Sequence, residues 1–423
     1  MNRVTTALAD LQLTRYPDTR TAREPLRAWD AADEYLLRRV TGTDASGTAH
    51  EAGRPAAEPV DLSGTVVVLG DRWGALAAAL AEFRPVQITD SFLSQQATRA
   101  NLARLGVEEG TVTLASTADP SPERIDVLLV RVPKSLALLE DQLCRLARHI
   151  HPGTVVVGAG MVAEIHTSTL NLFERIIGPT RTSLAVRKAR LIFSTPDLDR
   201  PRASDLWPRR FALPADVGLA AGRTVVNHGG VFAGERLDIG ARFFLRHLPW
   251  ELGGDHAPPR APGRIADLGC GNGVLGLAAS LAYPDAEVTF VDESYQALAS
   301  ARSTMAENGL LAAGETQGQA VDRAGQARFT LQDGLADVPP GYFDLVLNNP
   351  PFHTHQTTPD MTAWRMFNDS KAALRPGGEL WVVGNRHLGY HVKLRRVFGN
   401  CEVIASDSKF VVIRAVQGTE GER

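Results

Sequence analysis

Four consecutive residues, Asn349, Pro350, Pro351 and Phe352, combine hydrogen-bond acceptors with an aromatic ring. The apolar run before them, 343–347, predicts a buried strand, and the prolines must end it because proline cannot continue a central strand. The Asn349 side-chain carbonyl and the Pro350 backbone carbonyl then provide two neighbouring acceptors. Two acceptors beside a ring suit a planar group that carries NH2. Asn-Pro and Pro-Pro are also ordinary turn signals, so these residues alone leave open a simple strand-to-loop turn.

A glycine-rich turn lies upstream, between an expected strand at 264–268 and an expected helix at 274–282. It contains Gly269, Gly271, Asn272 and Gly273, and Asp267 precedes it in the strand. Glycine at such a turn lets the backbone approach a ligand closely and exposes N–H groups at a helix N-terminus. The same turn fits a nicotinamide dinucleotide fold, so it does not by itself identify the ligand.

Two acidic residues close the next expected strands. Asp292 follows the strand 287–291, where a carboxylate can accept both hydroxyls of a ribose. Asp333 follows the strand 328–331, where it or its neighbouring backbone can reach an adenine amino group. All of these residues lie at carboxyl ends of strands, the edge at which such sheets bind ligands.

An adenosine-type ligand beside a pocket for NH2 predicts methyl transfer from S-adenosylmethionine to an exocyclic or amide nitrogen. A dehydrogenase has no use for Asn-Pro-Pro-Phe at this strand. Hydrogen bonds from the NH2 group to the Asn349 and Pro350 carbonyls favour a more tetrahedral nitrogen, and Phe352 can hold the ring by stacking. No strong base is needed, so positioning and electrostatics supply most of the rate gain. A target base inside a duplex must be extruded to fit.

The elements that position these residues belong to an α/β fold. Strands alternate with helices in both halves of the chain, which predicts parallel, doubly wound sheets. We expect two tandem Rossmann-like S-adenosylmethionine-dependent methyltransferase domains at 1–210 and 211–423, the first of them degenerate. We interpret 194–197 and 201–204 as parts of a connector, and 41–58 and 311–326 as surface loops.

The first half repeats the pattern of the second in altered form. The stretch from Val66 to Gly74 keeps the strand and the outer glycines but carries Asp71, Arg72 and Trp73 between them. Asp90-Ser91 corresponds to Asp292-Glu293-Ser294, and Arg131-Val132 takes the place of Asn-Pro. These correspondences favour an internal duplication over two unrelated doubly wound domains.

The sequence resembles the bacterial ribosomal RNA guanine-N2 methyltransferases with tandem domains, and most closely their large-subunit members. The resemblance covers nearly the whole chain and is carried by 132–140, 165–170, 237–244, 291–294, 349–353, 385–390, 398–401 and 409–412. It implies methylation of the exocyclic N2 of a guanine in large-subunit ribosomal RNA. It also assigns the glycine turn, Asp292 and Asp333 to S-adenosylmethionine, Asn349 to Phe352 to the target guanine, and the N-terminal domain to RNA binding or support. The loops 41–58 and 311–326 are longer than the family pattern.

Composition constrains the remaining possibilities. The 423 residues carry 45 Lys+Arg against 48 Asp+Glu, so RNA must be bound by local patches rather than by bulk charge. Cys144, Cys270 and Cys401 form neither a disulfide framework nor a zinc pattern, and we expect no metal. No apolar run is long enough to span a bilayer and no signal peptide is visible. We expect a cytoplasmic protein without membrane contact, and a monomer.

Several further residues and readings stay open. A basic cluster at 386–396 and a second at 181–190 are candidate phosphate contacts. The stretch 227–232 either covers the cofactor or enters the target pocket, although we expect Phe232 in the core. Small-subunit ribosomal RNA, a protein glutamine or a DNA adenine remain alternative targets, because an Asn-Pro-Pro-Phe quartet serves each of these.

Overall fold

The computed structural model describes residues 3–5, 10–16, 27–42, 58–200, 206–256, 260–311, 326–350 and 359–418. The chain divides into two compact units, 1–206 and 207–423. Each unit is an α/β domain built on a seven-stranded sheet, and a short two-stranded ribbon accompanies each sheet. The ribbons are β1 (Arg3–Thr5) with β2 (Asp10–Gln12), and β10 (Arg209–Ala212) with β11 (Thr224–Asn227).

The sheet of the first unit has the strand order β5-β4-β3-β6-β7-β9-β8. Strands β3 to β7 pair in parallel, whereas β9 is antiparallel to both β7 and β8. The strands are β3 (Val66–Leu69), β4 (Val86–Thr89), β5 (Thr113–Ser116), β6 (Ile125–Arg131), β7 (Ile150–Met161), β8 (Thr180–Thr182) and β9 (Ala189–Ser194).

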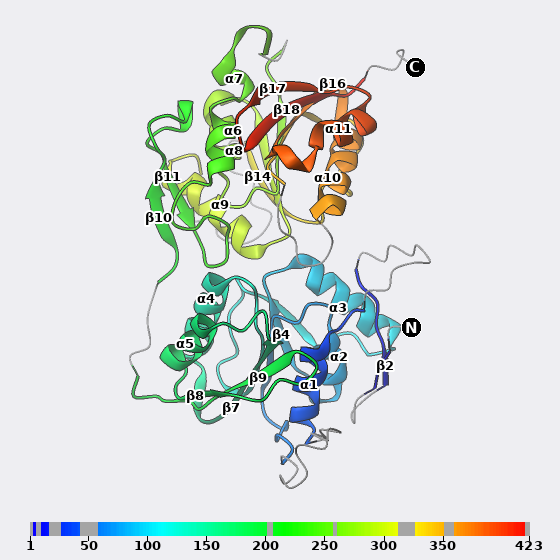
Figure 1. Ribbon diagram of the computed structural model, residues 1–423, viewed down its shortest axis with the longest axis vertical. Helices are drawn as coiled ribbons and strands as arrows, with labels where there is room; N and C mark the ends of the chain where they lie inside the picture. The colour runs from blue at the N-terminus through cyan, green and yellow to red at the C-terminus, as the bar shows by residue number, and fades with distance from the viewer. Residues whose placement is uncertain are drawn as a thin grey trace. The chain divides into compact units, whose positions relative to one another are not determined.

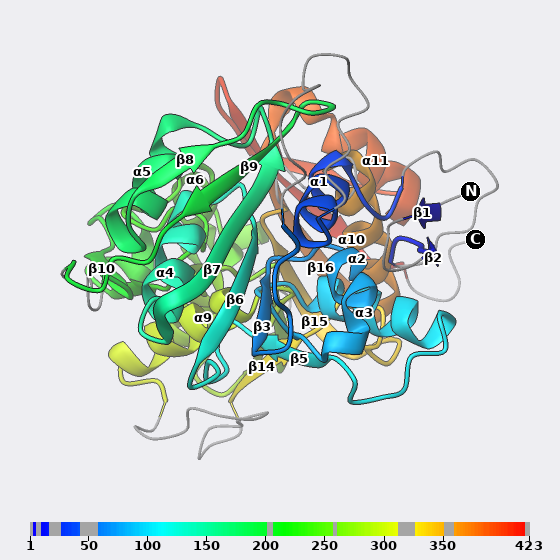
Figure 2. The same ribbon diagram turned by 90° about the horizontal axis from the view of Figure 1, so that it is seen from below.

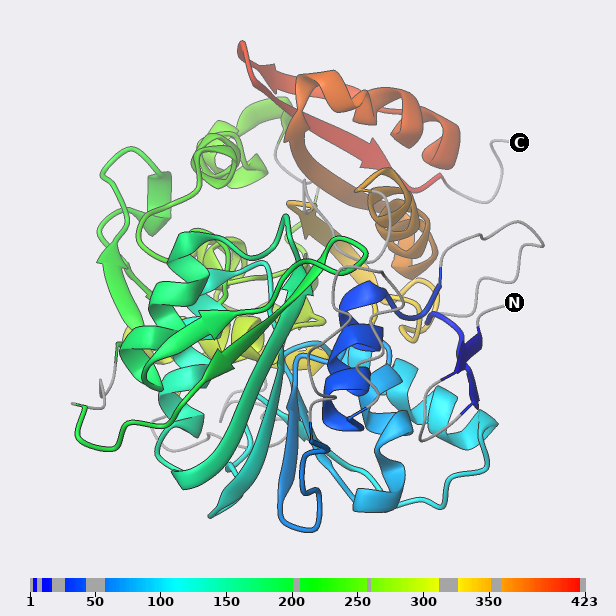
Figure 3. The ribbon, with the colours of Figure 1, turned by 60° about the horizontal axis from the view of Figure 1, so that its bottom comes forward.

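Helices cover both faces of this sheet. One face packs against α1 (Ala31–Val40), α2 (Ala75–Ala79) and α3 (Phe92–Arg104), and the other against α4 (Leu136–Leu146) and α5 (Thr167–Ile176). Figure 2 shows α4 and α5 on one side of β6 and β7, with α2 and α3 on the other. Figure 3 shows the same three layers, with the dark blue α1 against the sheet. Because the sheet is covered on both faces, its central strands are almost wholly apolar.

The second unit repeats this topology, with the strand order β14-β13-β12-β15-β16-β18-β17. Its strands are β12 (Arg264–Leu268), β13 (Glu287–Asp292), β14 (Ala327–Leu331), β15 (Phe343–Asn348), β16 (Leu374–Asn385), β17 (Glu402–Ser406) and β18 (Phe410–Val416). The strands β12 to β16 are parallel, and β18 is antiparallel to β16 and β17. The matching strand orders agree with the internal duplication expected from the sequence.

The helices of the second unit divide in the same way. One core packs α6 (Ile239–Leu245), α8 (Val274–Ala282) and α9 (Tyr295–Glu307) against the sheet, and the other packs α10 (Pro359–Ala373) and α11 (Tyr390–Phe398). Figure 1 shows α6 and α8 on one side of β16 and β18, and α10 and α11 on the other. A short helix, α7 (Pro249–Leu252), follows α6.

The connector expected at 194–197 begins one residue too early, because Ser194 is the last residue of β9, and its second part, 201–204, lies outside the described residues. Leu191–Ser194 belong to β9, because their alternating side chains continue the antiparallel pairing with β7. Most of the two expected surface loops, 43–57 and 312–325, lies outside the described residues.

Candidate active site

The glycine turn joins β12 to α8, and each of its glycines has a positive φ: 71° at Gly269, 53° at Gly271 and 78° at Gly273. The reasons for glycine differ along the turn. A Cβ on Gly273 would lie 2.8 Å from the Cβ of Ala301 on α9, whereas a Cβ on Gly271 would have no heavy atom within 4 Å. Gly273 therefore allows close packing, and Gly271 leaves open space over the turn, as close approach of a ligand requires.

Asp292, at the end of β13, holds the turn from one side. Its Oδ2 accepts a hydrogen bond from the Gly271 N–H at 2.9 Å and its Oδ1 accepts one from the Ser294 N–H at 3.0 Å. Burial raises the pKa of this carboxyl, against the opposing effect of these hydrogen bonds. The Glu293 N–H also donates to this carboxyl, and a carboxylate has about four acceptor positions, so acceptor capacity remains beside the turn.

Asp267 lies fully buried beneath the same turn. Its Oδ2 accepts a 2.8 Å hydrogen bond from the Gly276 N–H, and its Oδ1 is buried without a hydrogen-bond partner. Burial raises the pKa of Asp267 to about 8, and the nearby Asp292 carboxylate adds to the rise. A positively charged ligand above the turn would favour the ionised form of this side chain.

Asn272 connects the turn to β11. Its Nδ2 donates a 3.1 Å hydrogen bond to Oδ1 of Asn227, which is fully buried and whose own Nδ2 has no partner. Sequence reasoning missed how β11 is held. The N–H groups of Thr224 and Val226 in β11, and of His228 directly after it, donate to side chains spaced four residues apart on α9 and its C-cap: Asn308 at 3.2 Å, Thr304 at 3.0 Å and Ser300 at 2.9 Å. That polar stripe at helical spacing was the available signal.

Phe232, five residues beyond Asn227, is not a core residue, and that expectation is wrong. Its side chain is 68% exposed. The segment around it contains Gly230 and Ala233 with positive φ values, so the backbone leaves the regular path of β11 before Phe232.

Asp333 is already partnered. Its Oδ1 forms an ion pair with Arg365 of α10, a residue that sequence reasoning did not select. Burial raises the pKa of Asp333, Arg365 lowers it, and a nearby carboxyl, Asp337, raises it again. Its assignment to an adenine amino group remains a prediction.

The end of β15 brings the Asn-Pro pair next to the glycine turn. β15 lies beside β12, with Asn348 opposite Leu268. Asn348 is fully buried and its Nδ2 donates a 2.8 Å hydrogen bond to the Leu268 carbonyl. The next residue, Asn349, has a buried Oδ1 without a hydrogen-bond partner, and Pro350 follows. Pro351 and Phe352 lie outside the described residues.

The first unit presents different side chains at the positions that correspond to Asp267, Asp292 and Asn349. In β3 and β12 the residues Leu69 and Leu268 lie opposite Val130 and Asn348, so the next residue, Arg131, takes the place of Asn349. By the same registers Val68 replaces Asp267, and Thr89 rather than Asp90 replaces Asp292. Asp90 therefore corresponds to Glu293, one position later than the sequence comparison placed it.

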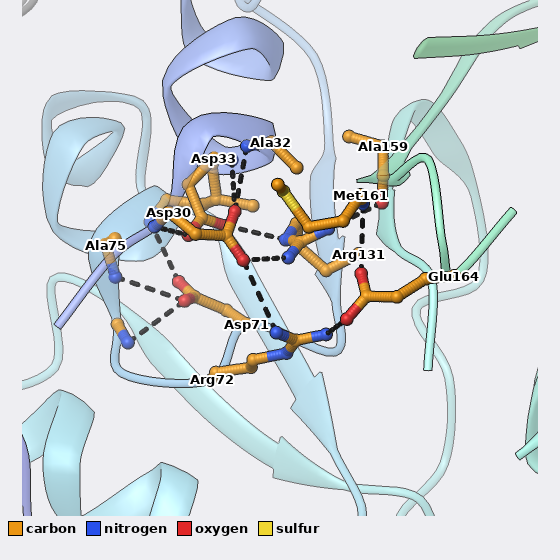
Figure 4. A network of polar contacts seen from close by, with 12 residues as sticks. Asp30, Ala32, Asp33, Asp71, Arg72, Ala75, Arg131, Ala159, Met161 and Glu164 are labelled. Atoms are coloured by element: carbon orange, nitrogen blue, oxygen red, sulfur yellow. Dashed lines mark hydrogen bonds and ion pairs between the residues drawn. The ribbon is translucent and has the colours of Figure 1, made fainter. Parts of the chain in front are cut away.

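An ionic network occupies this edge of the first unit (Figure 4). The Arg131 side chain is fully buried between Asp30 at 2.9 Å, Asp33 at 2.6 Å and the carbonyl of Ala159 at 2.7 Å. Arg72, in the place of Gly271, pairs with Glu164 at 2.7 Å. Burial, opposed by Arg131, raises the pKa of Asp33 to about 6.

Asp71 lies in the turn of the first unit that corresponds to the glycine turn. This buried carboxylate accepts hydrogen bonds from the N–H groups of Gly74, Ala75, Leu76 and Ala77 at 2.9–3.1 Å. It therefore saturates the start of α2 with a side chain of the protein itself.

The two basic clusters differ in their partners. At the end of the second unit the side chains of Arg386, His387, His391, Arg395 and Arg396 are exposed. Arg386 donates to the Asp407 carbonyl and Arg396 lies over the Trp364 ring, whereas in the first unit Arg181 lies over the Phe193 ring and Arg187 is paired with the Glu34 carboxylate at 3.0 Å. The cluster on α11 is therefore the better candidate for phosphate contacts.

Two further observations concern only the part of the chain that the structure describes. No helix there combines the length and apolar character needed to cross a membrane. No group of three or more His, Cys, Asp or Glu side chains there is arranged to hold a metal ion.

Comparison with known proteins agrees with this architecture. The family model "RLMG N-terminal domain" matches 1–198, and "Methyltransferase small domain" matches 222–414. In solved structures, the T. thermophilus 16S rRNA N2 methyltransferase RsmC, in complex with AdoMet and guanosine, has a TM-score of 0.69 at 19% identity, covering 98% of this chain and 97% of that one. This likeness confirms the expected fold of two tandem Rossmann-like domains.

Curated relatives are similar over nearly their whole length. Ribosomal RNA large subunit methyltransferase G of Streptomyces griseus is 60% identical, over 99% of this chain and 100% of the relative. The protein of the same name from Stutzerimonas stutzeri is 45% identical, over 97% of this chain and 98% of the relative. The chain therefore belongs to the ribosomal RNA large subunit methyltransferase G family.

Proposed function

We propose that this protein transfers a methyl group from S-adenosylmethionine to the exocyclic N2 of a guanine in large-subunit ribosomal RNA. The observation that carries the proposal is the Asn349 side-chain oxygen, a buried acceptor without a partner one residue past the strand beside the glycine turn. A buried acceptor without a partner costs free energy, and an NH2 group of a bound target can satisfy it. The names of the relatives support the choice of large-subunit RNA.

The second unit offers a fitting site for the cofactor. The open space at Gly271, the unpartnered Oδ1 of Asp267 and the remaining acceptor positions of Asp292 suit a cationic, ribose-containing ligand. We assign Asp267, Gly269, Gly271, Asn272, Gly273, Asp292 and Asp333 to it. When bound there, S-adenosylmethionine would supply an electrophilic methyl group and leave as the neutral thioether, and the methylated amino nitrogen would give one proton to solvent.

The protein's own groups orient the target. Asn349 Oδ1 and the Pro350 carbonyl each accept a hydrogen bond from one N–H of the amino group. These hydrogen bonds draw the nitrogen lone pair out of conjugation with the ring. Pro351 and Phe352 complete the expected quartet, with Phe352 stacking on the base. No general base is needed, because the nitrogen becomes acidic only after it has gained the methyl group. Positioning and fixed acceptors supply the rate gain.

We assign the first unit, 1–210, to RNA binding or support and the second, 211–423, to catalysis. Arg72 and Arg131 take the positions of Gly271 and Asn349, which hold the open space and the free acceptor in the second unit, and Asp71 accepts the N–H groups at the start of α2. The exposed basic residues of α11 suit the phosphate backbone. We place the enzyme in the cytoplasm, because bacterial ribosomal RNA is transcribed and assembled there.

Transfer of a labelled methyl group tests the proposal. Protein-free large-subunit RNA, small-subunit RNA and assembled subunits, all from cells lacking this protein, are offered to the wild type and to Asn349→Ala. We expect N2-methylguanosine in large-subunit RNA, reduced by at least about a hundredfold in the variant, as for loss of a catalytic acceptor. Label only in small-subunit RNA would keep the reaction and assign it to small-subunit RNA as the target. Absence of label in any RNA despite cofactor binding would overturn the proposal in favour of protein glutamine or DNA adenine.

A further inference from the structure

Asn385, the last residue of β16, carries another buried side-chain oxygen without a hydrogen-bond partner. The residue precedes a short 3-10 helix, Arg386–Leu388, at the position where an Asn side chain usually caps the first N–H groups. It forms no such cap. The Arg386 N–H instead donates to the Lys409 carbonyl at 2.9 Å. The Asn385 oxygen is therefore not used to hold the local fold.

Strand register places this oxygen at the same edge of the sheet as Asn349. β16 lies next to β15 and parallel to it, with Val382 opposite Asn348. Asn349 and Asn385 therefore both lie at or just past the carboxyl ends of neighbouring strands. By this register Asn349 is level with Val383, so Asn385 lies on the neighbouring strand, about 4.8 Å away, and two residues, about 6.6 Å, farther in the strand direction.

Side-chain alternation places both residues on the same face. Leu345 and Leu347 of β15 and Trp381 and Val383 of β16 all belong to the core that contains α6 and α8. Because side chains alternate between faces along a strand, Asn349 and Asn385 continue these two rows. That face is the one on which α8 follows the glycine turn.

The chemistry of the target supplies a use for a second acceptor. Asn349 and Pro350 can hold any NH2 group and so do not separate guanine from adenine or an amide. On the Watson–Crick edge of guanine the N2 amino group lies next to a second donor, N1–H. In adenine the ring nitrogen beside the amino group is an acceptor. An oxygen facing that position therefore forms a hydrogen bond with guanine. With adenine, the oxygen faces the acceptor ring nitrogen, a mismatch that polar sites reject strongly.

We propose that Oδ1 of Asn385 accepts the N1–H of the target guanine, which makes Asn385 a specificity-determining residue of this enzyme. The inference rests on the proposed function and extends it from the amino group to the identity of the base. It assigns the base-reading role to the end of β16 and the amino-group role to the end of β15.

A substrate analogue that lacks only the relevant contacts tests the assignment. The target guanosine is first mapped by mass spectrometry, and an RNA fragment is made with guanosine or 2-aminopurine riboside at that position. 2-Aminopurine keeps the amino group but has no N1–H and no O6. Single-turnover kcat/KM is measured for the wild type, Asn385→Ala and Asn385→Asp, and 2-aminopurine fluorescence reports binding of the analogue.

The expected pattern is specific to an acceptor. Asn385→Ala should lower kcat/KM for guanosine RNA about 10- to 100-fold, the usual cost of one buried hydrogen bond. Its kcat/KM for 2-aminopurine RNA should stay within about twofold of the wild-type value. Asn385→Asp should keep the preference for guanosine, because a carboxylate also accepts from N1–H. The matched control is Asn368→Ala. The exposed Asn368 amide on α10 donates to the Trp364 carbonyl at 2.7 Å, and its removal should leave kcat/KM unchanged for both RNAs.

Other results would overturn the proposal. An equal loss on both RNAs in Asn385→Ala would reveal a structural role. Loss of the preference in Asn385→Asp would show that the amide N–H, and not the oxygen, reads the base. A wild type that does not methylate guanosine RNA at all would instead overturn the proposed function itself.

Discussion

The side-chain amide nitrogen of Asn348 donates a 2.8 Å hydrogen bond to the backbone carbonyl of Leu268. Leu268 is the last residue of β12, directly before the glycine turn, and Asn348 is the last residue of β15, directly before Asn349. The bond thus ties the strand that leads to the cofactor turn to the strand that leads to the target acceptor. It fixes the position of one reactant relative to the other.

Replacing Asn348 by Ala should therefore slow the reaction more than it weakens cofactor binding. A misplacement of about 1 Å can cost about a hundredfold in rate, so we expect kcat to fall about 10- to 100-fold while the Kd for S-adenosylmethionine changes by less than about threefold. Single-turnover methylation and calorimetric titration measure the two quantities. An unchanged kcat in a folded variant would contradict this role.

Asn400 offers a matched control for that variant. Its side chain also ties a strand, through hydrogen bonds to the N–H and carbonyl of Val416 at 2.9 and 2.8 Å. Val416 lies opposite Glu379, six residues before Asn385 in β16. Asn400→Ala should lower stability by about 1 kcal/mol and leave kcat unchanged.

Asp267 should make the stability of the second unit depend on pH. Its pKa of about 8 is above the value of 3.8 that the group has when unperturbed. The folded state then binds the proton more tightly, so this contribution to stability is complete below about pH 4 and is lost as the pH rises to 8. The loss is about 1.4 kcal/mol per pH unit over that range. Asp267→Asn should show no such slope.

Denaturant unfolding of both forms at pH 5, 6, 7 and 8, without cofactor, checks this expectation. The difference in the free energy of unfolding between Asp267→Asn and the wild type should grow in favour of the variant as the pH rises. A constant difference across the series would mean that Asp267 does not titrate there.

Arg131 should be essential to the stability of the first unit and irrelevant to cofactor binding. Its removal takes the cation away from the buried Asp33 and leaves Asp30 with Arg72 at 3.4 Å, and breaking a buried pair in this way costs about 3–5 kcal/mol. Arg131→Met should show this loss by hydrogen exchange in β3 and β6, with an unchanged Kd for S-adenosylmethionine. Arg124→Met, which removes an exposed partner of Asp126, should cost less than about 1 kcal/mol.

The sequence was informative where local chemistry decides the structure. Strand 264–268 and helix 274–282 were predicted with their observed bounds, because apolar runs and the glycines between them mark these elements. Contacts between distant segments were not predictable in this way. The Asp333–Arg365 pair and the Asn227–Asn272 bond join residues 32 and 45 positions apart, and only the fold brings them together. Phe232 was misassigned because an exposed aromatic side chain looks like a core residue in sequence.

Substitution by alanine should mainly lower stability at Gly273 and mainly weaken cofactor binding at Gly271. Both have positive φ values, 53° and 78°, so each substitution carries a backbone cost of about 1–2 kcal/mol. A Cβ on Gly273 would in addition lie 2.8 Å from Ala301 and collide with α9. Gly273→Ala should therefore lose the larger amount of stability. A Cβ on Gly271 meets no protein atom within 4 Å, so it should instead occupy space that the cofactor needs.

We accordingly expect Gly271→Ala to weaken S-adenosylmethionine binding at least about tenfold, a loss of about 1.4 kcal/mol, while unfolding only slightly earlier than the wild type. Calorimetric titration and thermal unfolding of the two variants, measured side by side, separate the effects. Equal affinities in Gly271→Ala and the wild type would remove Gly271 from the cofactor site. A Gly273→Ala variant as stable as Gly271→Ala would show that α9 can move to make room for the alanine side chain.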